Sequence, residues 1–196
     1  GDDEVVDTGY GVSVSKKLAK RITWGLVAVA IVAFAFFGYE MLSVDSSELS
    51  MSKMDGSWKE LATDDVTIMY QFNKNGEFTE MRTIDDDGTK YGSMCTGTWE
   101  LSKQGVLGQC ISMKYDIESL VVDGHNEETG EVYDESDPTV NEMKQTLYAK
   151  YQKENQEVDK YKGTDKVYGL NNLTFSNDTI KQNGISIMVK IGDINR

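Results

Sequence analysis

Apolar and polar positions follow two different patterns in this 196-residue chain, and the change comes near residue 42. Residues 22–39 form a run of 18 residues without a charge, whereas the later part alternates apolar and polar side chains. An uncharged run of this length is typical of a helix that crosses a bilayer, and alternation is typical of half-buried strands. The sequence therefore predicts a transmembrane helix followed by a mainly β domain.

The flanks of the apolar run predict its orientation. A cluster of basic residues precedes it, an acidic residue follows it, and an aromatic ring lies near each end. The positive-inside rule then places the N-terminal tail in the cytoplasm and the domain in the periplasm or outside the cell, on a single-pass anchor in the cytoplasmic membrane. The flanking residues assigned to the anchor are Lys16, Lys17, Lys20, Arg21, Trp24 and Tyr39.

Two other interpretations of the run stay open. A cleaved signal peptide has a similar basic start and apolar core, and Ala33-Phe34-Ala35 faintly resembles a cleavage site, although apolar residues continue past it. A buried core helix is the second alternative, but such helices are seldom apolar on every face. We favour a retained anchor. The expected organisation is a disordered tail (1–15), a basic flank and helix (16–42), a spacer (43–53) and an extracytoplasmic domain (54–196).

Strand patterns recur along the domain at short intervals. Alternation over residues 66–73 predicts a strand with Val66, Ile68, Tyr70 and Phe72 on one face, followed by an Asn- and Gly-rich turn. Further strands are expected at 78–84, 95–101, 111–117, 168–175 and 185–191. Short strands with turns between them are typical of an antiparallel barrel or sandwich.

One helix interrupts these strands, over about residues 138–162. Asp137 is suited to cap it and Pro138 to occupy its first position. Val140, Met143 and Leu147 begin an apolar stripe at helical spacing. The stripe favours packing against the strands over binding of a partner.

Three short motifs resemble a known family. They are Gly56-Ser57-Trp58-Lys59, then Tyr70-Gln71-Phe72 with Gly76 and Phe78, and Gly97-Thr98-Trp99-Glu100-Leu101. Together they resemble the lipocalin-like domain of small envelope proteins from Bacteroidetes-type bacteria, over about residues 54–192. The resemblance implies a mainly β fold, an antiparallel lipocalin-like barrel with one inserted helix. It places five aromatic residues in the barrel interior: Trp58, Tyr70, Phe72, Phe78 and Trp99. The chain departs from the family in two respects, because many members are lipoproteins tethered through a Cys after the signal sequence, and because the acidic loop and helix look like an insertion.

Charge excludes one class of function. The net charge is −13, and residues after Leu42 carry 16 basic against 28 acidic side chains. Such a surface repels nucleic acid phosphates, so no nucleic-acid partner is expected. It would attract a cationic partner or a divalent metal, but acidity more commonly serves solubility.

The two cysteines, Cys95 and Cys110, are a candidate disulfide. A pair outside the cytoplasm tends to oxidise, and a hairpin that turns at Ser102-Lys103 would place the two opposite each other. Cys110 is out of phase with Ile111 and its alternating neighbours, so the pairing also requires a bulge at Gly108. Two separate thiols are the alternative.

Residues 123–137 hold seven carboxylates and His125, the only histidine. Oxygen-rich loops bind calcium, but the ligand spacing of an EF-hand is missing, and we favour a solvated loop. No phosphate-binding glycine loop, C-x-x-C pair or hydrolase elbow occurs, so neither a cofactor nor catalysis is expected.

These features favour a membrane-anchored binding or accessory module that acts through contacts with an envelope protein. The alternative is a lipocalin-type binder of a small apolar ligand, suggested by the aromatic-rich strands. A hydrolase with paired carboxylates is a third hypothesis, which no residue spacing supports.

Overall fold

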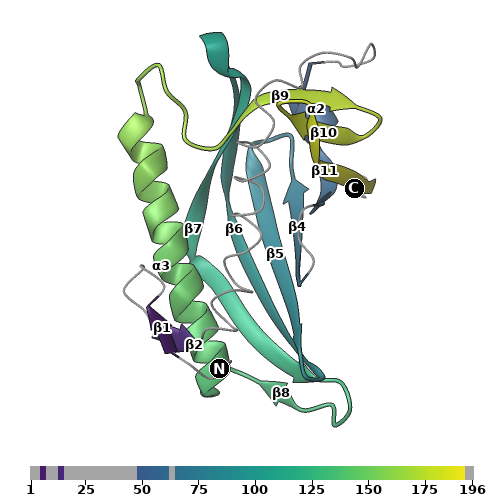
Figure 1. Cartoon of the computed structure of the whole chain (residues 1–196), viewed down its shortest axis with the longest axis vertical. Coiled ribbons are helices and arrows are strands. Elements are labelled where there is room, and N and C mark those ends of the chain that lie inside the picture. Colours follow the sequence, from purple (N-terminus) through teal and green to yellow (C-terminus); the bar gives the residue numbers. More distant parts are fainter. Residues whose placement is uncertain (1–4, 8–12, 16–47, 62–64, 193–196) are drawn as a thin grey trace.

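The domain is built from nine antiparallel strands and one long helix (Figure 1). The structure is a computed structural model, and it describes residues 5–7, 13–15, 48–61 and 65–192. The elements after the N-terminal region are α2 (Met51–Met54), β3 (Gly56–Glu60), β4 (Val66–Phe72), β5 (Glu77–Asp86), β6 (Thr89–Gln104), a 3-10 turn (Gly105–Leu107), β7 (Gly108–Asn126), β8 (Val132–Tyr133), α3 (Pro138–Tyr161), β9 (Leu170–Ser176), β10 (Thr179–Gln182) and β11 (Ile185–Gly192).

All nine strands belong to one sheet, in the order β6-β5-β4-β3-β11-β10-β9-β7-β8. Strand β6 also pairs with β7, so the sheet closes nearly into a ring. Consecutive strands β3 to β7 are neighbours, and β9 to β11 fill the space between β3 and β7. The prediction of a mainly β antiparallel fold with one helix is confirmed.

Alternation of side chains explains which face of each strand turns inward. In β4, the apolar residues Val66, Ile68, Tyr70 and Phe72 are buried and their neighbours are not. The chain then reverses through a turn that ends at Gly76, whose φ of +91° favours glycine. The observed strand and turn are those that the sequence predicts.

The hairpin of β6 and β7 is longer than expected, with strands of 16 and 19 residues. The prediction of a turn at Ser102-Lys103 is wrong, because the ladder continues to the pair Gln104 and Gly108. The ladder of β6 with β7 is regular near Gly108 and irregular between Met94 and Thr96, whereas the pairing of β7 with β9 shifts register between Gln109 and Ile111. The extra residues belong to β7, because Met94 and Thr96 of β6 pair with Val121 and Asp116, so β7 bulges near its middle while β6 keeps a continuous ladder with β5.

Helix α3 begins and ends where the sequence predicts. The Asp137 carboxylate accepts hydrogen bonds from the backbone N–H groups of Thr139 and Val140, and Pro138 occupies the first turn. The helix packs beside β7 (Figure 1). Its buried face belongs to the core and consists of Val140, Met143, Thr146, Leu147, Lys150 and Tyr151.

One hydrophobic core fills the space between the curved sheet and α3. The five aromatic residues expected in the interior are all buried, at 2% exposure or less, and belong to this core. Phe72 is at the centre of the aromatic packing, with ring centroids 5.5 Å from Tyr70 and 5.3 Å from Trp99. The indole N–H groups of Trp58 and Trp99 donate to the backbone oxygens of Met54 and Asn73, so both rings are also held by hydrogen bonds.

Gly97 is a position where only glycine fits. A Cβ there would lie 2.2 Å from the carbonyl oxygen of Lys114 and 2.6 Å from the ring of Phe78. Gly97→Ala should therefore lower the free energy of unfolding by at least the roughly 1–3 kcal/mol typical of overpacking. Urea denaturation of the purified chain measures the effect. Gly92→Ala on the same strand is the matched control, because its nearest contact would be an ordinary 3.5 Å; equal loss of stability in both variants would contradict the prediction.

Two short strands are described in the N-terminal tail, β1 (Val5–Asp7) and β2 (Ser13–Ser15). They pair antiparallel, whereas the sequence predicts disorder for residues 1–15. Strand β2 lies beside α3, although the expected topology would place a membrane between the tail and the domain.

The predicted membrane anchor, residues 16–42 with its flanking basic and aromatic side chains, lies outside the described residues. Within the part of the chain that the structure describes, no helix combines the length and apolar character that a bilayer crossing requires.

Candidate functional site

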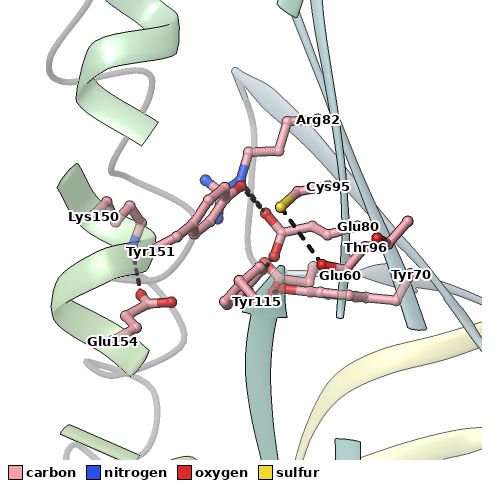
Figure 2. A network of polar contacts seen from close by, with 10 residues as sticks. All are labelled: Glu60, Tyr70, Glu80, Arg82, Cys95, Thr96, Tyr115, Lys150, Tyr151 and Glu154. Atoms are coloured by element: carbon pink, nitrogen blue, oxygen red, sulfur yellow. Dashed lines mark hydrogen bonds and ion pairs between the residues drawn. The ribbon is translucent and has the colours of Figure 1, made fainter. Parts of the chain in front are cut away.

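A network of buried charged and phenolic side chains lies between the sheet and α3 (Figure 2). Its centre is Glu80 on β5, which faces inward together with Arg82, two residues further along the strand. The Arg82 Nε atom lies 2.6 Å from one Glu80 oxygen, and the Tyr151 hydroxyl donates to the same oxygen at 2.5 Å. The Tyr115 hydroxyl donates to the other oxygen. Both Glu80 oxygens are thus bonded, as a buried carboxylate requires.

The protonation of this centre follows from its contacts. Burial alone would raise the pKa of Glu80, but the Arg82 charge and the hydrogen bonds from Tyr115 and Tyr151 outweigh burial and lower it. Burial and the Glu80 charge raise the pKa of both tyrosines well above the ordinary value, so they remain donors. The centre is therefore an ion pair with two neutral phenols.

A second buried carboxylate, Glu60 on β3, lies in the same interior. One of its oxygens accepts a hydrogen bond from the Tyr70 hydroxyl at 2.9 Å, and the other, Oε2, has no hydrogen-bond partner among the described residues. Burial raises the pKa of Glu60 to about 7, against the lowering effects of Arg82 and Tyr70. Glu60 and Glu80 therefore differ in charge at neutral pH and below, because Arg82 contacts Glu80 directly.

Helix α3 contributes the other wall of the network. The Tyr151 ring stacks on Tyr115 of β7, with centroids 4.1 Å apart and planes 11° apart. Lys150 is buried beside it, and its Nζ atom lies 2.8 Å from a Glu154 oxygen. Burial lowers the pKa of Lys150 despite that carboxylate. The network thus joins α3 to β5 and β7 through polar bonds as well as apolar packing.

The network contains the residue types of an acid–base site, but its side chains are buried. Its central side chains, Glu60, Tyr70, Glu80, Arg82, Tyr115 and Tyr151, are all 5% exposed or less. A general acid or base must come within hydrogen-bond reach of a substrate, and these groups are enclosed by sheet and helix. The arrangement therefore joins α3 to the sheet through buried and partly buried polar bonds.

A cleft lies on the outside of the sheet. It has a volume of about 280 Å³ and lies between the β6–β7 ladder, the last turn of α3 and the loop that follows. Lys114 on β7 spans one side of it and lies 2.8 Å from Asp159 on α3. Most lining side chains carry groups that can donate or accept hydrogen bonds, among them Ser102, Lys114, Lys162, Thr164 and Lys166. The cleft is open to solvent and polar.

The predicted disulfide is wrong. Cys95 and Cys110 are both free thiols, and both are buried. Cys110 is paired with Ser102, whereas Cys95 lies at the bulge beside Glu80, about seven positions along the ladder. At about 3.4 Å per residue this separation far exceeds the reach of a disulfide. Burial raises the pKa of the Cys95 thiol to about 11, which leaves it protonated and unreactive.

The acidic stretch 123–137 is more ordered than a solvated loop. Residues 123–126 extend β7, and β8 pairs with it at Gly124 and His125. Several carboxylates serve local bonds: Asp137 caps α3, Asp134 accepts from Ser136, and Glu127 lies 2.8 Å from Lys90. Among the described residues, no group of three or more His, Cys, Asp or Glu is arranged to hold a metal ion.

The charged network was not predicted from the sequence, although the sequence of β5 contains one indication of it. Phe78 and Ile84 fix the inward face of β5, and the alternation that joins them puts Glu80 and Arg82 on that face. Two charged residues on an inward face two positions apart indicate a buried ion pair. The partners on β3, β7 and α3 carry no comparable local signal.

Comparisons with protein-family models, with curated proteins and with solved structures gave no significant match to this chain.

Proposed function

We propose that the chain is a membrane-anchored accessory module of the cell envelope, in which a lipocalin-like domain outside the cytoplasm binds a protein partner and performs no catalysis. The uncharged run at residues 22–39, with basic residues before it, supports the anchor. An anchored domain is held where envelope proteins are its neighbours. The domain's own surface then determines what it binds.

The observation that carries this proposal is the polar cleft outside the sheet. Two elements distant in sequence form it, the β6–β7 ladder and the end of α3, and the Lys114–Asp159 ion pair joins them. A solvent-open cleft lined by hydrogen-bonding groups suits an extended protein segment, which offers backbone and polar side chains in return. The other cations that line the cleft, Lys162 and Lys166, favour a segment that carries acidic residues.

The interior of the sheet favours this proposal over an apolar ligand carrier. Pockets for small apolar ligands are concave and lined mainly by apolar groups. In this domain the buried aromatic rings contact one another, and the space between the rings and α3 holds the Glu80–Arg82 network. A small apolar ligand would have to displace buried charges that are already paired.

Site-specific photo-crosslinking in intact cells tests the partner. A crosslinking residue at Ser102 or Thr164, in the cleft, should yield one defined adduct with an envelope protein. The same residue at Gln152, on the exposed face of α3, should not. The double variant Lys162→Glu/Lys166→Glu should reduce the adduct strongly because it reverses the charge at the cleft. Lys74→Glu/Lys181→Glu carries the same change of net charge elsewhere and should leave the adduct unchanged.

The proposed membrane orientation, with the domain outside the cytoplasm, is tested by fusing a reporter to the C-terminus of the same chain. The reporter is one that is active only outside the cytoplasm. An active reporter is expected. An inactive reporter would overturn the predicted topology and agree with the contact between β2 and α3. Equal adducts from Ser102 and Gln152, or recovery of an apolar small molecule in stoichiometric yield instead of a protein, would overturn the proposed binding mode.

A further inference from the structure

Three methionines stand side by side on the outer face of the sheet. Met69 of β4 is the direct cross-strand partner of Met81 on β5, and Met81 is the direct partner of Met94 on β6. The row continues to Val121 on β7 and is bounded at its other end by Lys59 on β3. We call Met69, Met81 and Met94 the methionine row.

The methionine row faces away from the core. Met81 lies between Glu80 and Arg82, whose side chains turn inward, so the Met81 side chain turns outward. Met94 is 47% exposed, and Met69 and Met81 are partly exposed. Methionines on a solvent-facing sheet surface are not required by the core, which is complete without them. Their thioethers are therefore accessible to a ligand.

The spacing of the row suits a single small ion. Direct cross-strand partners have Cβ atoms about 4.5–5.5 Å apart, so the two outer methionines stand roughly 10 Å apart with Met81 between them. Each methionine has three rotatable side-chain bonds, which allow the sulfur of an outer residue to lean over the middle strand. Three Sδ atoms can then converge above Met81 without a change in the backbone.

We propose that the methionine row binds a soft monovalent cation, Cu(I) or Ag(I), through three thioether sulfurs. Thioethers are soft ligands that select Cu(I) over hard cations such as calcium or magnesium. The next residues on the same face, Thr67, Gln71, Thr79 and Thr83, offer only hard oxygen donors and amides. The negative charge of the domain attracts a cation to this surface. This site is independent of the polar cleft and of the proposed partner.

Thioether ligation has a signature that other sites lack. Imidazole and thiolate ligands must lose a proton before they bind a metal, so their affinity falls in acid. A thioether has no such proton, and binding at the row should be nearly unchanged between pH 7 and pH 5. The binding is also independent of Cys95 and Cys110, which are buried.

The test is anaerobic titration of the purified full chain in detergent with Cu(I), in competition with a chromogenic Cu(I) chelator. One equivalent should bind, at pH 5 as at pH 7. Met81→Leu keeps the volume and apolar character of the row but removes its central sulfur. It should weaken binding by at least the roughly 10–100-fold that follows loss of an outer-shell partner. Met51→Leu removes a thioether from α2, and Cys95→Ala and Cys110→Ala remove the thiols; all three should bind as the unmodified chain does.

Copper-edge X-ray absorption of the loaded chain should show sulfur neighbours, and these should change in Met81→Leu. Absence of stoichiometric binding by the unmodified chain would overturn the proposal. Undiminished binding by Met81→Leu would do the same, as would loss of binding in a cysteine variant that stays folded by circular dichroism. A row that serves only as an apolar contact surface would give the first of these results.

Discussion

Arg82→Met should lower the free energy of unfolding by about 3–5 kcal/mol, the cost of leaving one partner of a buried ion pair without the other. The substitution removes the guanidinium 2.6 Å from Glu80 while the carboxylate stays fully buried. Methionine approximates the length of the arginine stem, so the loss reports the charge more than the volume. Urea denaturation, followed by tryptophan fluorescence and far-UV circular dichroism, measures it.

The double variant Glu80→Gln/Arg82→Met supplies the control. It removes both charges, and the new amide offers an oxygen to accept from one of the two phenols and an NH2 group to donate to the other, because Tyr115 and Tyr151 donate to different Glu80 oxygens in the unmodified chain. Replacement of a whole buried pair is often nearly neutral, so the double variant should recover most of the lost stability. If Arg82→Met and the double variant were equally destabilised, the ion pair would not be the source of the effect.

Glu60 should make the domain less stable as the pH rises from 5 to 8. Its pKa in the folded state is about 7, against an ordinary value of 4.5, because the carboxyl is buried. The folded state therefore holds a proton that the unfolded state has released. The stability from this protonation is fully present below pH 4.5 and is lost as the pH rises through about 7, a total of about 3 kcal/mol. The lowered pKa of Glu80 acts below pH 4.5 and lies outside this window.

Glu60→Gln isolates this contribution. Glutamine keeps an oxygen to accept the hydrogen bond of Tyr70 but does not titrate. Urea unfolding at a series of pH values should show the unmodified chain losing stability between pH 5 and pH 8 relative to Glu60→Gln. Parallel pH profiles for the two proteins would mean that the buried Glu60 does not titrate in this range.

Local patterns predicted the parts of the fold that depend on neighbours in sequence. Strand β4 follows from the alternation of Val66 to Phe72, and α3 follows from Asp137, Pro138 and the stripe that begins at Val140. The inward positions of Tyr70 and Phe72 followed from the same alternation in β4. In each case one face of a single element meets the core, so the element's own sequence specifies its burial.

Pairing between distant strands could not be predicted in the same way. The hairpin turn was expected at Ser102 because the two cysteines suggested it, whereas the observed ladder extends to Gln104 and separates the thiols. The Glu80 network requires Tyr115 and Tyr151 to arrive from β7 and α3, which are 35 and 71 residues away. The methionine row likewise exists only once the registers of β4, β5 and β6 are known.

The order in which the sheet closes has a consequence for how the chain reaches its native state. Strand β3 pairs with β11 and β7 pairs with β9, so the last strands in the sequence complete the sheet that the first strands begin. Segments β3 to β7 can form successive hairpins early, but their free edges stay unpaired until residues 170–192 arrive. Contacts between such distant segments are slow to form, and exposed edges favour aggregation in the interval. Synthesis would thus deliver an open intermediate, and a chaperone that covers strand edges would be of most use just before β11 docks.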